Sequence, residues 1–278
     1  MAKKAKTNNL VVVSDLHCGC RLGLCPPEPI ELDDGGTYTA SKFQRKVWAW
    51  WTEFWEEWVP HITQGEPYDV AINGDTLEGE HHGSHTYISA NAEDQKKIAR
   101  AIVAPIRERA ERLYIIRGTE AHDGKSGANA ETLAREMGAV KDPESGQFAR
   151  WELCKRVGGA IVHLTHHISV SSSPYTKTTA LVREWVTITE RRATRGVPIY
   201  DFIVRAHRHR YDAVPMRTPH AYGGAIGLPG WQGKTPFAFR TVMGRCEPPQ
   251  FGGIVIRQGD EDCYHREFQR KLDDPAIE

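Results

Sequence analysis

The sequence predicts an α/β fold in which two β-sheets face each other and helices cover their outer sides. Three observations support this prediction. Five short apolar runs have the character of buried strands, amphipathic segments lie between them, and strand-like segments without intervening helices follow residue 209. The alternating part predicts a parallel sheet, and the final part predicts a second, more antiparallel sheet.

The five apolar runs are short and end at a glycine or a polar residue, as buried strands do. They span residues 10–14, 68–73, 113–117, 160–165 and 202–205. The later strand-like segments are 213–217, 237–243, 253–257 and 263–269. Because no helical pattern separates these last four, we expect them to form the second sheet.

Four segments between the strands carry helical signals. Residues 42–59 are rich in tryptophan, which predicts a core helix whose second aromatic side could also cover a subunit contact in a homo-oligomer. Asn91 is placed to cap a helix that extends to residue 113. Residues 129–137 predict a short helix before Gly138, and residues 178–195 predict a longer one.

The chain has 278 residues, enough for one large core. We expect residues 1–278 to form a single domain, with 1–8 as a disordered tail and 18–40 as a loop close to the active site. No apolar stretch is long enough to span a bilayer, and no apolar leader follows the basic N-terminus. A cytoplasmic protein without membrane contact is therefore expected.

Charge and cysteine content narrow the function. Lys plus Arg and Asp plus Glu both number 36, so the formal net charge is zero. A protein that follows long nucleic acids usually has a basic surface, so the balance favours a small or short substrate over duplex DNA without excluding a nuclease. Cys18, Cys20 and Cys25 lack the spacing of structural zinc sites, and we expect reduced thiols, with a zinc site as the alternative.

Metal-binding residue types follow all five predicted strands. In chain order they are Asp15 and His17, then Asp75, then His122, then His166 and His167, and finally His207 and His209. Ligands of α/β sheets bind beyond the carboxyl ends of the strands. One such residue is weak evidence for a site, whereas five strand ends in order are strong evidence. Mixed carboxylate and imidazole ligands suit Zn, Fe, Mn or Ni.

The order of these residues resembles the calcineurin-like metallophosphoesterases, whose pattern is D-x-H, G-D, G-N-H-[E/D], H and then G-H-x-H. The resemblance covers about residues 11–209, and a compatible strand-rich tail follows. It implies the α/β/β/α fold of that family and a pair of divalent transition metal ions (Mn, Fe, Zn or Ni).

The resemblance also implies a role for each ligand, carried over by position. Asp15, His17 and His209 hold metal one, Asp75 bridges both metals through its two oxygens, and His166 and His207 hold metal two. His167 takes the place of His166 if the register is one residue off.

The third motif departs from the family pattern. The chain reads G-T-E-A-H from Gly118 to His122, so Thr119 stands where the family has the Asn that completes metal two. Glu120 is chemically the better replacement ligand and Thr119 the poorer one. His122 is the expected general acid, which protonates the leaving group. In the last motif Ala206 replaces a Gly, a small steric change.

Side chains beside the motifs are candidates for substrate binding. These candidates are Arg117, Arg208, His82 and His85. The fork of an Arg matches phosphate geometry, and loop histidines after Asp75 could contact substrate or relay protons. For each of them the alternative is a solvated surface side chain.

These residues predict a metal-dependent hydrolase of phosphate esters. The expected enzyme is a phosphodiesterase for a nucleotide or nucleic-acid substrate, in which a hydroxide that bridges the metals attacks phosphorus. One alternative is a protein or nucleotide phosphomonoesterase. Another is a metal-stabilised phosphate-binding module that has lost turnover through the altered third motif.

Overall fold

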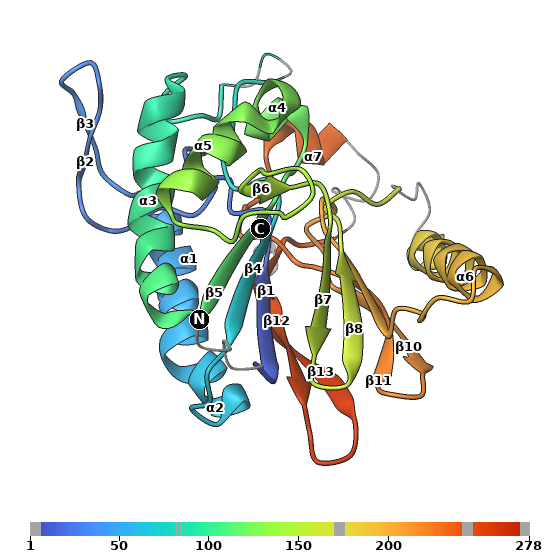
Figure 1. Ribbon diagram of the computed structural model, residues 1–278. Coiled ribbons are helices and arrows are strands. Elements are labelled where there is room, and N and C mark those ends of the chain that lie inside the picture. Colours follow the sequence, from blue (N-terminus) through green and yellow to red (C-terminus); the bar gives the residue numbers. More distant parts are fainter. Residues whose placement is uncertain (1–6, 82, 84, 170–175, 241–246, 273–278) are drawn as a thin grey trace, which may run out of the picture.

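The computed structural model describes residues 7–81, 83, 85–169, 176–240 and 247–272. Two β-sheets lie at its centre, with helices on both outer sides (Figure 1). This is the predicted four-layer α/β/β/α arrangement, so the fold class is confirmed.

The larger sheet has six strands in the order β13–β12–β1–β4–β5–β6. They are β1 (Asn9–Val13), β4 (Asp69–Asn73), β5 (Arg112–Ile116), β6 (Ala149–Arg150), β12 (Gln250–Gln258) and β13 (Cys263–Lys271). The strands β1, β4, β5 and β6 are parallel to one another, and β12 and β13 add an antiparallel edge.

The smaller sheet has five strands in the order β10–β11–β9–β8–β7. They are β7 (Leu153–Val157), β8 (Ala160–Leu164), β9 (Phe202–Arg205), β10 (Asp212–Arg217) and β11 (Tyr222–Gly227). The strands β8, β9 and β11 are parallel, while β7 and β10 are antiparallel edges.

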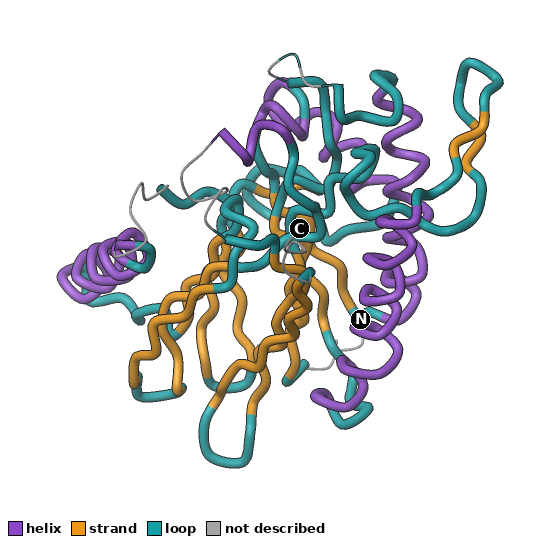
Figure 2. The backbone as a smooth tube through the Cα atoms, turned by 180° about the vertical axis from the view of Figure 1, so that it is seen from behind, coloured by secondary structure: helices purple, strands orange, loops and turns teal. Residues whose placement is uncertain are grey.

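Helices cover each sheet on the side that faces away from the other sheet (Figures 1 and 2). The larger sheet is covered by α1 (Lys42–Glu53), η1 (Phe54–Trp58), α2 (Val59–Thr63), α3 (Ala92–Arg109) and α5 (Ala128–Glu136). The smaller sheet is covered by α6 (Thr179–Thr194). The short elements α4 (Glu120–Asp123), η2 (Lys125–Gly127) and α7 (Pro236–Arg240) lie near one end of the sheets. The strands β2 (Ile30–Glu31) and β3 (Thr37–Tyr38) form a hairpin within the predicted 18–40 loop.

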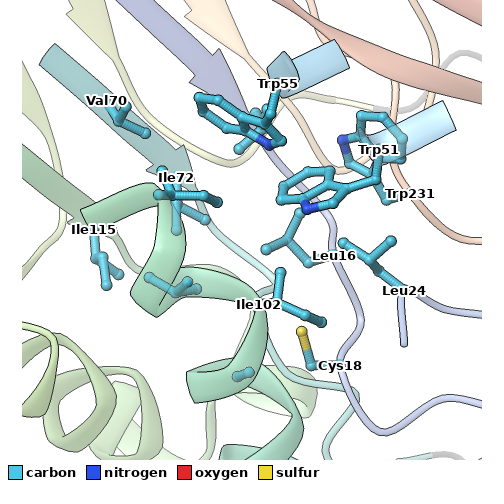
Figure 3. Packing of buried hydrophobic residues seen from close by; sticks show 14 of the residues in the cluster. Leu16, Cys18, Leu24, Trp51, Trp55, Val70, Ile72, Ile102, Ile115 and Trp231 are labelled. Atoms are coloured by element: carbon cyan, nitrogen blue, oxygen red, sulfur yellow. The ribbon is translucent and has the colours of Figure 1, made fainter. Parts of the chain in front are cut away.

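The tryptophan-rich helix is a core helix, as predicted. Trp51 and Trp55 are 4% exposed and pack with Trp231 beneath the loop that follows β1 (Figure 3). Leu16, in that loop, is fully buried in the same cluster. The aromatic core therefore fixes the backbone on both sides of His17, which matters for the site described below.

Four sequence predictions about the fold need correction. The final strands do not form a sheet of their own, because β12 and β13 pair beside β1 while β10 and β11 extend the smaller sheet. The predicted strand 237–243 begins as the helix α7, and its residues 241–243 lie outside the described residues. The helix capped by Asn91 ends at Arg109, because β5 begins at Arg112. The strands β7 and β11 were not predicted.

The predicted tail, residues 1–8, overlaps the described part of the chain at Thr7 and Asn8. Thr7 is 5% exposed, and its hydroxyl donates a hydrogen bond of 2.6 Å to Asp69 Oδ2, so this residue packs against β4. Residues 1–6 of the prediction lie outside the described residues. Among the described helices, none combines the length and the apolar character needed to cross a bilayer.

Candidate metal centre

The candidate ligands meet where the parallel strands of both sheets end. Asp15 and His17 follow β1, and Asp75 follows β4 beside them. Asp15 N donates to Gly74 O at 3.0 Å and His17 N to Asp75 O at 3.1 Å, so the two loops run side by side. The smaller sheet adds His166 after β8, and His207 and His209 after β9.

Six side chains form two groups that are close enough to bind metal ions. The first group is Asp15, His17 and His209, and the second is Asp75, His166 and His207. Within each group the ligand atoms lie within 4.8 Å of one another. These are the two ligand sets that the resemblance implied.

His166, and not His167, is the histidine of β8 that reaches the acids. Its Nε2 lies 3.1 Å from Asp75 Oδ2 and 4.0 Å from Asp15 Oδ1. Its Nδ1 lies 2.7 Å from the carbonyl oxygen of Asn73. This contact makes Nδ1 the N–H donor and leaves Nε2 to face the acids. His167 is exposed at the edge of the site.

Backbone strain is concentrated at the ligands. Seven described non-glycine residues have a positive φ angle, and five of them are candidate ligands: Asp15, His17, Asp75, His207 and His209. Side-chain-bearing residues rarely adopt this conformation, and it persists only where the surrounding structure imposes it. Hydrogen bonding between neighbouring loops therefore holds these side chains in position at a cost in local stability.

Two glycines of the motifs allow close approach at the site. A Cβ on Gly74 would lie 2.3 Å from His166 Nδ1, and a Cβ on Gly118 would lie 2.1 Å from Asp75 Oδ1. Both distances are shorter than any real contact of a Cβ atom. Gly74 and Gly118 therefore cannot carry a larger side chain while His166 and Asp75 keep these positions.

Thr119 occupies one oxygen of Asp75. The Thr119 N–H and hydroxyl both donate to Asp75 Oδ1, at 2.7 and 3.1 Å. The other oxygen, Oδ2, faces His166, and lies 3.9 Å from His207 Nδ1 and 3.8 Å from His122 Nε2. The resemblance implied a bridge through both oxygens; in the structure Oδ1 accepts from Thr119, and Oδ2 is the oxygen nearest the imidazoles of His166, His207 and His122.

The acids and imidazoles of the site neutralise one another. Burial alone would raise the pKa of Asp15, but His209 and His166 outweigh it and lower this pKa to about 2. Burial alone would lower the pKa of His166, but Asp75 and Asp15 raise it to about 10. A bound metal ion requires neutral imidazole, so it would replace the proton on His166.

The residues present fit divalent transition metal ions. Asp15 Oδ1 and His166 Nε2 are buried and meet hydrogen-bond geometry with no atom in the described part of the chain. Their nearest contacts are ion pairs, to His209 Nε2 at 3.2 Å and to Asp75 Oδ2 at 3.1 Å respectively. Buried polar atoms are normally paired, so two such atoms in the two ligand groups favour an ion as their partner. The donors are carboxylate oxygen and imidazole nitrogen, which suit Mn, Fe, Zn or Ni.

The altered third motif brings His122 to the site and leaves Glu120 outside it. The turn after β5 forms the helix α4, in which Glu120 is exposed and accepts a hydrogen bond from Ser126 N at 3.4 Å. His122 Nε2 lies close enough to His17 and Asp75 to form a third ligand-like group with them. The structure thus places His122 and the Thr119 hydroxyl, rather than Glu120, beside the ligands.

Glu78 is a buried carboxylate that supports two of these histidines. Its Oε2 lies 2.9 Å from His17 Nδ1, and its backbone carbonyl accepts a hydrogen bond from His122 Nδ1. Gln232 also donates to Oε2, at 2.9 Å. Carboxylates in this position orient metal-binding histidines. The signal for this role in the sequence was a glutamate three residues after Asp75.

The four substrate-binding candidates have different surroundings. Arg208 lines the cavity above the ligands. Arg117 does not face the site: its guanidinium is buried and donates to Ala149 O at 2.9 Å and Ser126 O at 2.6 Å. The prediction for Arg117 is therefore wrong, because backbone acceptors hold its fork. His85 is exposed and does not line the cavity, and His82 lies outside the described residues.

A cavity of about 270 Å³ opens above the ligands. Its floor includes His17, Asp75, His122, His207 and His209. Its outer wall is formed by Arg208, Arg210, residues 232–235, Phe237, Ala238 and residues 247–249. The described part of α7 and the segments beside it therefore determine what reaches the metal ligands.

The cysteines of the 18–40 loop take no part in the metal groups found among the described residues. Cys18, Cys20 and Cys25 are buried free thiols. Burial raises the pKa of Cys20 and of Cys25 to about 12, so both thiols are protonated at neutral pH. The prediction of reduced thiols agrees with this placement.

Comparison with known proteins gives similarity in fold. No protein-family model and no curated protein sequence matches the chain. Similar solved structures include a predicted phosphoesterase from Streptococcus pneumoniae, with 10% identity, 95% of this chain and 98% of that chain covered, and a TM-score of 0.35. Another is Vps29 from Chaetomium thermophilum, with 10% identity, 98% and 100% covered, and a TM-score of 0.38. A third is the sulfate thiohydrolase SoxB from Thermus thermophilus, with 12% identity, 98% and 57% covered, and a TM-score of 0.41.

At these low TM-scores, the strand order and the ligand geometry of the chain itself carry the assignment. Two facing sheets with helices outside, and candidate ligands at the ends of the four strands β1, β4, β8 and β9, are the features that the resemblance implied. The resemblance to the calcineurin-like metallophosphoesterases is therefore confirmed at the level of fold, and the candidate ligands remain a prediction for the metal centre.

Proposed function

We propose that this chain is a metal-dependent hydrolase of phosphate esters, and that its substrates are phosphodiesters of the nucleotide or nucleic-acid type. The observation that carries the proposal is the pair of ligand groups on either side of Asp75 Oδ2, at the floor of an open cavity. Two adjacent metal ions in such a cavity can hold a phosphate and activate water.

The ligand groups assign residues to each ion. Asp15, His17 and His209 would hold one divalent transition ion, His166 and His207 the other, and Asp75 Oδ2 would serve both. When bound, the ions supply Lewis-acid activation of water and of the phosphate. Thr119 holds Asp75 through Oδ1, and Glu78 fixes the ring of His17.

His122 is proposed to act at the leaving group. Its Nδ1 is engaged by the Glu78 carbonyl, so Nε2 is the nitrogen that faces the cavity floor. Burial and the neighbouring His17 lower the pKa of His122 to about 4, so Nε2 has no proton at neutral pH in the chain alone. The negative charge of a bound phosphate favours a proton on Nε2 and the charge of bound metal ions opposes it, so His122 would donate to the leaving group only where the phosphate lies against Nε2.

The charges around the cavity favour a diester over a monoester. Arg210 pairs with Glu247 and lies 3.4 Å from Asp212, and Arg208 lies 3.9 Å from the same Asp212. Acidic partners therefore compensate both guanidinium groups. A diester has a single negative charge and needs less compensation than the dianion of a monoester.

The proposal is tested with the purified protein and added Mn²⁺. We expect hydrolysis of bis-p-nitrophenyl phosphate to exceed that of p-nitrophenyl phosphate, and a chelator to stop both. Short oligonucleotides and cyclic nucleotides then separate a nuclease from a small-molecule diesterase. Faster monoester cleavage would favour the phosphomonoesterase, and tight phosphate binding without turnover under any metal would favour the binding module. The variant Asp75→Asn serves as the control for contaminating activity.

A further inference from the structure

The outer wall of the cavity contains an aromatic ring that the proposed reaction does not use. Phe237, in the helix α7, lines the cavity and is 54% exposed. Ligand pockets are lined largely by apolar and aromatic side chains, so an exposed ring on the wall of this cavity is a candidate for ligand contact. The wall continues through Pro248 and Pro249, whose rings add uncharged surface.

Two residues further along, Phe239 provides a comparison within the same helix. Phe239 is also 54% exposed, but it does not line the cavity. The amino group of Lys234 lies 5.3 Å from the centre of the Phe239 ring. The two phenylalanines therefore share type, helix and exposure, and differ in whether they line the cavity.

The charged groups of this wall carry little excess charge. Besides histidines, its described cations are Arg208, Arg210 and Lys234. Arg210 is paired with Glu247, and Asp212 lies within 4 Å of both arginines. A second phosphate or a polyanionic chain would have few uncompensated cations to bind here, whereas a neutral group needs none.

We propose that this wall is a subsite for the planar, uncharged ring of the substrate ester, and that a nucleobase stacks on Phe237. The inference rests on the proposed function, because it places the phosphate at the metal ligands a short distance away. Bases stack on aromatic side chains with little dependence on sequence, and alanine substitution of such a platform costs a measurable part of the affinity. A cavity of about 270 Å³ is at the small end for ligand sites, which favours a single nucleotide over a long chain.

The test measures equilibrium binding by calorimetry to the full-length protein loaded with Mn²⁺. The probes are AMP and ribose 5-phosphate, which share phosphate and sugar and differ in the base, together with inorganic phosphate. We expect AMP to bind at least about fivefold more tightly than ribose 5-phosphate. Phe237→Ala should remove this preference and leave the affinity for ribose 5-phosphate unchanged. Phe237→Trp should retain the preference, and so should the matched control Phe239→Ala.

Two results would overturn the subsite. One is equal binding of AMP and ribose 5-phosphate to the unmodified protein, and the other is an undiminished preference in Phe237→Ala. Failure of the proposed function has a different signature. In that case neither inorganic phosphate nor either sugar phosphate binds to the metal-loaded protein, and bis-p-nitrophenyl phosphate is not hydrolysed.

Discussion

Thr119 directs two hydrogen bonds at one oxygen of Asp75, from its backbone N–H at 2.7 Å and from its hydroxyl at 3.1 Å. The resemblance implied an asparagine ligand at this position. The threonine instead fixes the carboxylate so that Oδ2 points to the imidazoles of His166 and His207. The altered motif thus exchanges a ligand for a group that orients one.

The hydroxyl of Thr119 should tune metal affinity. Thr119→Val keeps the backbone hydrogen bond and loses the hydroxyl one, while Thr119→Ser keeps both. Loss of a group that orients a metal ligand typically weakens binding about 10–100-fold. We expect Thr119→Val to raise the dissociation constant of the weaker of the two Mn²⁺ sites by about tenfold in a chelator-buffered titration. Thr119→Ser should have the dissociation constant of the unmodified protein. Equal affinity in both variants would show that the backbone N–H alone orients Asp75.

Asp75 and Asp15 should differ in how many ions they retain. Asp75→Ala should lose both ions, because Asp75 groups with His166 and His207 and, separately, with His17, whereas Asp15→Ala should mainly lose one. Elemental analysis of the purified variants measures this. Asp142→Ala, which changes a carboxylate in an exposed turn, is the control with full metal content. Full metal content in Asp75→Ala would refute the bridging assignment.

His122 should matter most for poor leaving groups. An alkoxide needs a proton on departure, whereas p-nitrophenolate leaves without one, and loss of a general acid costs about 10²–10⁴-fold in rate. We expect His122→Ala to slow cleavage of a dinucleotide far more than cleavage of bis-p-nitrophenyl phosphate, with metal content unchanged. An equal loss on both substrates together with a missing ion would instead make His122 a metal ligand beside His17 and Asp75.

Substitutions of Arg117 and Arg208 should have different effects: the first should mainly lower the free energy of unfolding, and the second should mainly raise KM. Arg117→Met leaves the carbonyls of Ala149 and Ser126 without their buried donor, so we expect unfolding free energy to fall by about 2 kcal/mol or more in urea titrations. Arg208→Met should lower stability less, because Arg208 donates to one backbone carbonyl, that of Lys177, in an exposed contact. It should raise KM for a phosphodiester by about tenfold, because Arg208 lines the cavity. The opposite pattern would show that Arg117 reaches the substrate.

His163 should make stability depend on pH. The ring stacks on Tyr200, its Nδ1 accepts from Arg205 and its Nε2 donates to Glu152. Burial and then Arg205 lower the pKa of His163 below 6.5. As pH falls through 6.5, the unfolded chain takes up a proton that the folded chain resists, so this contribution destabilises the fold at low pH.

The variant His163→Gln isolates this effect. In metal-free protein, we expect the stability advantage of the unmodified chain over the variant to shrink as the pH is lowered from about 7.5 to about 5.5. Urea unfolding at each pH measures the difference. A difference that stays constant or grows would show that His163 is protonated in the folded state.

The sequence by itself determined the parallel strands and the ligand types. Short apolar runs such as β1 and β4 are buried on both faces, so their composition alone marks them, and their ends place Asp15 and Asp75. The order of aspartates and histidines along the chain carried the family resemblance, and that resemblance implied the two candidate ligand groups. Local patterns carry this information because each motif lies in the turn directly after a strand.

Only the tertiary structure decided how the chain uses its less regular parts. The strands β7 and β11 are weak in local pattern, and they form because β8 and β9 offer edges to pair with. The direction of Arg117, the exposure of Glu120 and the support of His17 by Glu78 depend on side-chain contacts between distant loops. Such contacts leave no periodicity in the sequence, because their energy arises only when the loops at the ends of both sheets come together.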